Sequence, residues 1–111
     1  MTIDGFYAVS FSALLRGGGL VVVENGKVRG GDNEYLYSGE VSGSDDQLRA
    51  VLKIKAFAPN AVSVFNTKGG EYTLQLTGQV TGNDLIFSGS APGSGQTITI
   101  RGRRLCGTSL D

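Results

Sequence analysis

The feature that most constrains this chain is an alternation of apolar and polar residues with a period of two, which recurs along its whole length. Successive side chains of a β-strand point to opposite faces, so this period is typical of strands that bury one face. The clearest case is residues 48–56, where Leu48, Leu52 and Ile54 alternate with charged residues. No stretch has the helical period, and only residues 57–66 have room for one short turn of helix. The sequence therefore predicts an all-β protein.

Eight such segments follow one another, mostly with short links between them. The strongest turn signal is Asn25-Gly26, a pair typical of a two-residue hairpin. Short links favour antiparallel neighbours, and closing the sheet removes its exposed edges. At 111 residues the chain has the length of one domain, spanning residues 1–111. We predict a closed eight-stranded antiparallel up-and-down β-barrel, with strands at 5–13, 20–24, 27–30, 35–41, 48–56, 73–80, 85–89 and 97–103.

The interior of an eight-stranded barrel is either filled by side chains or holds one small ligand. Small residues at inward positions, such as Ala50, Gly78 and Gly89, either leave a cavity or let the barrel flatten, and the sequence leaves both open. A carrier of a small molecule is therefore one functional hypothesis. The residues predicted to line the cavity are Phe6, Ala8, Ala50, Leu52, Ile54, Leu76 and Phe87.

The first predicted strand is apolar on both of its faces. With Phe6 and Ala8 assigned to the interior, Tyr7, Val9 and Phe11 point outward and need a cover. Either the 57–66 connection or a second copy of the chain could supply that cover. We expect a homodimer, with Tyr7, Val9 and Phe11 at the dimer surface.

The composition argues against catalysis. The chain has no histidine, which removes the commonest general base and the commonest zinc ligand. Its one cysteine, Cys106, is predicted to be a small hydrophobe of the last strand. The glycine runs at 16–19 and 93–95 lack the lysine and helix of a phosphate-binding loop and are interpreted as turns. We expect no enzyme, no cofactor and no metal site.

Charge also limits the partners. Ten basic and ten acidic residues give a formal net charge of zero, whereas nucleic-acid binders usually carry a basic excess. Five cations share outward positions of two predicted strands. Either they form a solvated outer face or they recognise an acidic protein partner or a lipid head group. These residues are Arg49, Lys53, Lys55, Arg101 and Arg103.

The start of the chain has neither a basic segment nor an apolar segment of the secretory type. The longest apolar run, Leu20–Val23, is too short to span a bilayer. We therefore expect a cytoplasmic protein without a membrane span.

Several segments together, in their order and spacing over roughly residues 4–55, resemble the first half of the GrlR family, negative regulators of type III secretion genes. Single motifs such as Asn-Gly-Lys are unspecific, and the second half of the chain is similar only in its strand pattern. The segments are Asp4-Gly5-Phe6-Tyr7, Gly18-Gly19-Leu20-Val21-Val22, Glu24-Asn25-Gly26-Lys27-Val28, Gly30-Gly31-Asp32 and Tyr37-Ser38-Gly39-Glu40-Val41.

The resemblance implies a lipocalin-like barrel that forms a homodimer and acts by binding a protein partner, a transcriptional activator. It also implies that the barrel can take an apolar, lipid-like molecule. The acidic Glu-Asp-Glu-Asp run with which the family recognises its partner falls on residues 43–46, where only Asp45 and Asp46 are acidic. These two residues are the predicted partner-binding site, in an exposed turn. The chain departs from the family here, because Gly43 and Ser44 stand in place of the first two acids.

Overall fold

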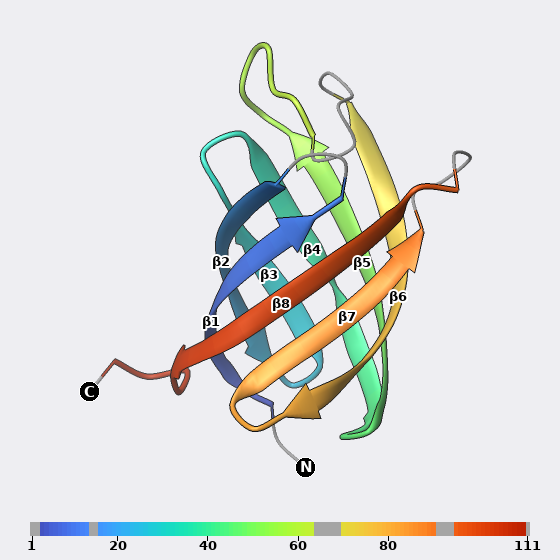
Figure 1. The fold of residues 1–111 in the computed structure, drawn as a ribbon. Helices are drawn as coiled ribbons and strands as arrows, with labels where there is room; N and C mark the ends of the chain where they lie inside the picture. Colours follow the sequence, from blue (N-terminus) through green and yellow to red (C-terminus); the bar gives the residue numbers. More distant parts are fainter. Residues whose placement is uncertain (1–2, 14–15, 64–69, 91–94, 111) are drawn as a thin grey trace.

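The computed structural model describes residues 3–13, 16–63, 70–90 and 95–110. Each strand pairs antiparallel with the next, and β8 pairs with β1, so the sheet is a closed up-and-down barrel (Figure 1). The predicted fold class is confirmed. The strands are β1 (Gly5–Ser12), β2 (Arg16–Glu24), β3 (Lys27–Gly31), β4 (Tyr35–Ser44), β5 (Gln47–Ala56), β6 (Glu71–Thr81), β7 (Asp84–Ser90) and β8 (Thr97–Cys106).

Most turns between strands follow the local sequence, but the glycine run at 16–19, interpreted as a turn, lies in β2. Asn25 and Gly26 join β2 to β3 with φ angles of 53° and 77°, as a type I′ hairpin turn requires. The β4–β5 hairpin is tighter than predicted, because β4 continues past Val41 and pairs Ser44 with Gln47. Only Asp45 and Asp46 remain in that turn. Backbone hydrogen bonding to β5 thus extends β4 through residues of low strand propensity.

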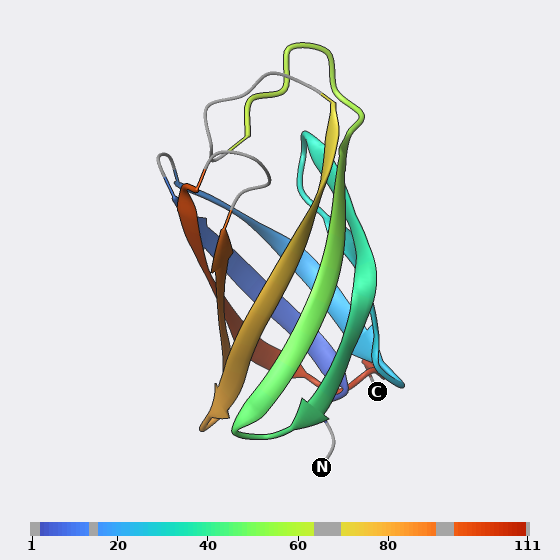
Figure 2. The same ribbon diagram turned by 90° about the vertical axis from the view of Figure 1, so that its right-hand side faces the viewer.

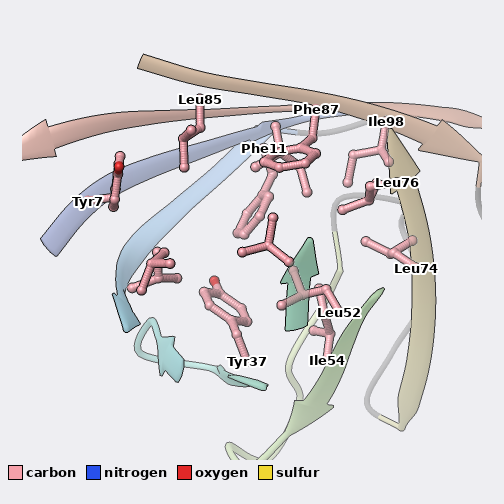
Figure 3. Close-up of a cluster of buried hydrophobic side chains, with 14 of the residues drawn as sticks. Tyr7, Phe11, Tyr37, Leu52, Ile54, Leu74, Leu76, Leu85, Phe87 and Ile98 are labelled. Carbon is pink, nitrogen blue, oxygen red and sulfur yellow. The ribbon is translucent and has the colours of Figure 1, made fainter. Parts of the chain in front are cut away.

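The buried apolar side chains fill the inside of the barrel (Figure 3). The inward face predicted for β5 is confirmed: Leu48, Leu52 and Ile54 are buried, and the charged residues of the opposite face are exposed. On β6, β7 and β8 the predicted alternation also holds. The buried residues there are Leu74, Leu76, Leu85, Phe87, Ile98 and Ile100.

The assignment of the two faces of β1 was wrong. Tyr7 and Phe11 are 3% and 6% exposed and belong to the core, whereas Phe6 and Ala8 lie half-buried on the outer wall. The pairing decides this, because Tyr7 lies opposite the inward Val21 of β2. Bulky side chains also fill an interior to the required packing density better than alanine and serine do. Tyr7, Val9 and Phe11 therefore cannot form a dimer surface, and Phe6 and Ala8 cannot line a cavity.

Small inward residues serve two different purposes. A Cβ atom at Gly78 would overlap the carbonyl oxygen of Ile86 on the neighbouring β7, so this glycine allows a close approach of two strands. Ala50 instead borders empty space. Of the two outcomes that the sequence left open, a cavity is therefore present.

The two ends of the barrel are closed differently (Figure 2). At the lower end, where Asp45 and Asp46 turn, Ile3 of the N-terminal segment is buried. At the upper end, residues 57–63 fold back and bury Ala61 and Ser63 completely or nearly so. The sequence left room for one short turn of helix at residues 57–66. Residues 57–63 contain none, and residues 64–66 lie outside the described part. Within the described ranges, no helix is long and apolar enough to cross a bilayer.

Candidate functional site: two compartments and an outer patch

The interior holds an apolar cavity of about 60 Å³ in its lower and middle part. Of the residues predicted to line it, Ala50, Leu52, Leu76 and Phe87 do so. Ile54 lines a second pocket higher in the barrel. The residues that sequence reasoning placed outside contribute much of the remaining wall, namely Tyr7, Val9 and Phe11.

The volume of this cavity limits what it can hold. An engineered cavity of about 150 Å³ in another protein accepts benzene. A space of about 60 Å³ is less than half of that and takes only a few heavy atoms. A lipid chain would have to displace side chains of a closely packed core.

A second pocket, of about 90 Å³, opens at the upper end and is lined by polar as well as apolar groups. Phe11 borders both compartments. Its ring packs edge-on against Tyr37, with centroids 5.2 Å apart and planes at 85° (Figure 3). This aromatic pair separates the apolar cavity from the pocket above, which we call the upper pocket. Its lining includes Asp32, Glu34, Tyr35, Tyr37, Ser63 and Tyr72.

Asp32 organises the upper pocket. Its Oδ1 atom accepts hydrogen bonds from the backbone N–H groups of Glu34 and Tyr35, both at 2.7 Å. This local turn between β3 and β4 is one that aspartate favours. The Oδ2 atom accepts a hydrogen bond from the hydroxyl of Tyr37. The carboxylate is thereby fixed at the rim with one edge facing the tyrosines.

Tyr35 is the exception among the polar groups of the pocket. Its side chain is 4% exposed, yet its hydroxyl has no hydrogen-bond partner, which is true of no other buried side-chain polar atom in the described residues. By contrast, the buried Tyr7 hydroxyl donates to the carbonyl of Ile3 at 2.8 Å. Buried polar groups are nearly always paired.

Burial and nearby carboxylates keep the tyrosines of the pocket neutral. Burial raises the pKa of Tyr37 far above its usual value of 10.0, and the hydrogen bond to Asp32 raises it further. Burial raises the pKa of Tyr72 to about 12, with added effects of Tyr35 and Asp32, while a hydrogen bond with Ser63 lowers it. Burial also raises the pKa of Tyr35, followed by the charges of Glu34 and Asp32. These hydroxyls therefore stay protonated at neutral pH, where each can donate one hydrogen bond and its oxygen can accept another.

The outer wall carries an apolar patch that sequence analysis did not find. Pairing places Phe6 beside Val22 and Ala8 beside Leu20, and Gly31 separates Leu20 from Leu36. A Cβ at Gly31 would lie 3.3 Å from Leu36 Cδ2, so Leu36 leans across this glycine. Leu20 and Leu36 are 56% and 54% exposed. We call this group the outer apolar patch: Phe6, Ala8, Leu20, Val22 and Leu36.

Cations border this patch. Arg103 pairs with Ala8, Arg29 with Val22, and Lys55 with Leu36. The strands β5 and β8 are not neighbours, so their cations do not form one continuous patch as the sequence allowed. They lie on two sides of the outer apolar patch instead. Arg101 forms a salt bridge with Asp84 on β7, with 2.6 Å between Arg101 Nη2 and Asp84 Oδ2.

The other positions predicted from the sequence lie outside both the apolar cavity and the upper pocket. Asp45 and Asp46 are exposed at the tip of the β4–β5 turn, and Asp46 accepts a hydrogen bond from Ser44 at 3.1 Å. Cys106 is half-buried at the end of β8. In the described part of the chain, no three metal-ligating side chains of cysteine, aspartate or glutamate gather at one point.

Part of the upper pocket could have been predicted from the sequence. Tyr35 and Tyr37 are two residues apart and therefore share the inward face of their strand, with an aspartate just before it. Ser63 and Tyr72 had no such signal, because their place depends on how 57–63 folds over the barrel. A search of known family models and of curated proteins finds no match to this chain.

Proposed function

We propose that this chain is a non-enzymatic binding protein that docks an acidic, amphipathic segment of a protein partner on the outer apolar patch. In the GrlR family, which its first half resembles, the protein partner is a transcriptional activator. The observation that carries the proposal is the outer apolar patch itself. Exposed apolar groups that adjoin one another on a soluble barrel are typical of interaction sites.

Charge specifies the partner. Arg29, Lys55 and Arg103 border the patch, so a segment with apolar side chains and flanking acids complements it. A second copy of this chain would bring the same cations together, which disfavours a symmetric dimer through this face. The nearly filled interior also leaves the outside of the barrel as the larger binding surface.

A synthetic amphipathic peptide with a leucine stripe flanked by glutamates tests this. Titrated into the full chain, it should shift the backbone amide NMR signals of Leu20, Val22 and Leu36, and raised salt should weaken binding. A peptide with lysines in place of the glutamates is the charge control. Equal binding of both peptides, or shifts confined to other strands, would contradict the proposal.

Matched variants locate the docking point. Leu20→Glu should abolish peptide binding, whereas Leu110→Glu, the same substitution at a residue that is 81% exposed outside the patch, should not. Replacing both Asp45 and Asp46 with alanine should leave peptide binding intact. If that double variant alone weakened binding, the docking point would be the β4–β5 turn that the family resemblance implies.

Sedimentation of the purified chain tests the competing occupant. A monomer is the expected result. A dimer that Leu20→Glu dissociates would mean that a second copy covers the patch, and the proposed partner would be wrong.

A carrier of a small apolar molecule is the second candidate, favoured by the cavity of about 60 Å³. Xenon is a suitable probe, because small apolar cavities that stay dry bind it. We expect saturable xenon shifts at Leu52 and Phe87 that Ala50→Phe removes. Persistence of these shifts in Ala50→Phe would place the guest elsewhere.

A further inference from the structure

The buried hydroxyl of Tyr35 points to a ligand that completes it. A buried donor or acceptor without a partner destabilises a fold, so such groups usually have a role or a partner that binds from outside. Tyr35 is 4% exposed and lines the upper pocket, which has room for a group of a few heavy atoms. The missing partner therefore belongs in that pocket.

The acceptors around this hydroxyl specify the partner. A carboxylate offers about four acceptor positions. The two backbone N–H groups and the Tyr37 hydroxyl occupy three of those on Asp32. One position on Oδ2 remains, and Glu34 supplies a second carboxylate to the same lining. A ligand with several donors suits this arrangement.

The charges around the Tyr35 hydroxyl also favour a ligand with hydrogen-bond donors, and in particular a cation. Burial raises the pKa of Tyr35 most, and the charges of Glu34 and Asp32 raise it further, so the hydroxyl lies in a negative field. Arg16, which also lines the pocket, is exposed to solvent and therefore screened. Aromatic rings of Phe11, Tyr35 and Tyr37 form much of the wall, and their faces attract cations.

We propose that the upper pocket binds a small primary amine as its ammonium ion, held by the Tyr35 hydroxyl oxygen and the carboxylates of Asp32 and Glu34. An ammonium group has three N–H donors and no acceptor, which matches one hydroxyl oxygen and two carboxylates. The amine is a free molecule of a few heavy atoms, because the pocket measures about 90 Å³. This site is separate from the outer apolar patch and independent of the partner proposed above.

Ethylammonium chloride is the probe, with ethanol and sodium acetate as neutral and anionic molecules of similar size. Titrated into the full chain, ethylammonium should produce saturable NMR shifts of the Tyr35 ring, and the other two should not. Equal saturation by ethanol would show that the charge is irrelevant and overturn the assignment. Saturation by acetate alone, or by none of the three, would overturn it as well.

Variants connect the binding to the named groups. Tyr35→Phe keeps the ring and removes the unpartnered oxygen, so it should weaken ethylammonium binding about tenfold or more while the barrel stays folded. Glu34→Gln should weaken binding severalfold. Glu24→Gln is the matched control, because it removes one exposed carboxylate at the lower end of the barrel and should leave binding unchanged. Wild-type affinity in Tyr35→Phe would contradict the proposal, whatever the result for peptide docking.

Discussion

The two ends of the barrel interior each bury a tyrosine hydroxyl, but only one of these hydroxyls has a hydrogen-bond partner. At the lower end, the hydroxyl of Tyr7 is buried and donates to the carbonyl of Ile3, in a segment that closes the barrel. At the upper end, the hydroxyl of Tyr35 is buried as deeply and has no partner. The cavity nearer the lower end is lined almost wholly by apolar groups, whereas the upper pocket gathers two carboxylates and three tyrosines.

The two tyrosines differ in whether the fold itself supplies a hydrogen-bond partner for a buried hydroxyl. Every buried side-chain polar group that only stabilises a fold is expected to find its partner within the fold. The lower end meets that expectation, and the upper end does not. The unpartnered Tyr35 hydroxyl therefore favours the upper pocket as the part of the interior that binds a ligand.

The largest expected effect is on alkaline stability. Most of it arises from the upper end, although burial also raises the pKa of Tyr7 at the lower end. Tyr37 and Tyr72 have folded-state pKa values above the usual 10.0. Their contribution to stability is complete below about pH 10 and is lost as pH rises toward the folded pKa, about 12 for Tyr72. The loss is about 1.4 kcal/mol per pH unit for each tyrosine that stays neutral in the folded state.

Tyrosinate ultraviolet absorbance measures this directly. The folded protein should show little tyrosinate just above pH 10, and the signal should rise with unfolding. Gradual ionisation in a folded barrel would show that the upper tyrosines are exposed, and the contrast between the two ends would be lost.

The next largest effect is in the packed lower end. Leu48 is 1% exposed and lies near the buried Ile3. Leu48→Ala should lower the free energy of unfolding by about 2–5 kcal/mol, from lost burial and a new cavity. Denaturant unfolding measures it, with the exposed Val51→Ala as control, expected to change stability by far less. A small loss for Leu48→Ala would show that the lower end is loosely packed.

A smaller effect is expected for filling the apolar cavity. Ala50→Phe adds more volume than the cavity of about 60 Å³ offers, so it should destabilise the barrel by about 1–3 kcal/mol. Ala50→Val, which adds only two carbon atoms, should be neutral or stabilising. Thermal unfolding of both variants tests the size of the space. Stabilisation by phenylalanine would mean that the cavity is larger than described.

The sequence was sufficient for the architecture because period-two alternation and the Asn25-Gly26 turn are local signals. Strand β5 is the best example, since charged residues on one face left only one orientation for Leu52 and Ile54. Strand β1 was assigned with its faces exchanged because both are apolar. Its orientation depends on the pairing with β2, which is a non-local property.

The candidate sites were less accessible to sequence analysis. The outer apolar patch joins residues of β1, β2 and β4 through a glycine of β3, and no local pattern contains that geometry. The upper pocket combines an aspartate turn, residues of six strands and the 57–63 segment. The family resemblance, the protein partner and the role of Asp45 and Asp46 stay predictions.

The most direct test of the difference between the two ends is a pair of unfolding measurements. Tyr7→Phe removes a satisfied hydroxyl and leaves the Ile3 carbonyl unpaired, so the free energy of unfolding should fall by about 1 kcal/mol. Tyr35→Phe removes an unpartnered hydroxyl, so the free energy of unfolding should stay the same or rise by up to about 1 kcal/mol. An equal loss in both variants would show that Tyr35 has a partner within the fold, and would contradict a functional upper pocket.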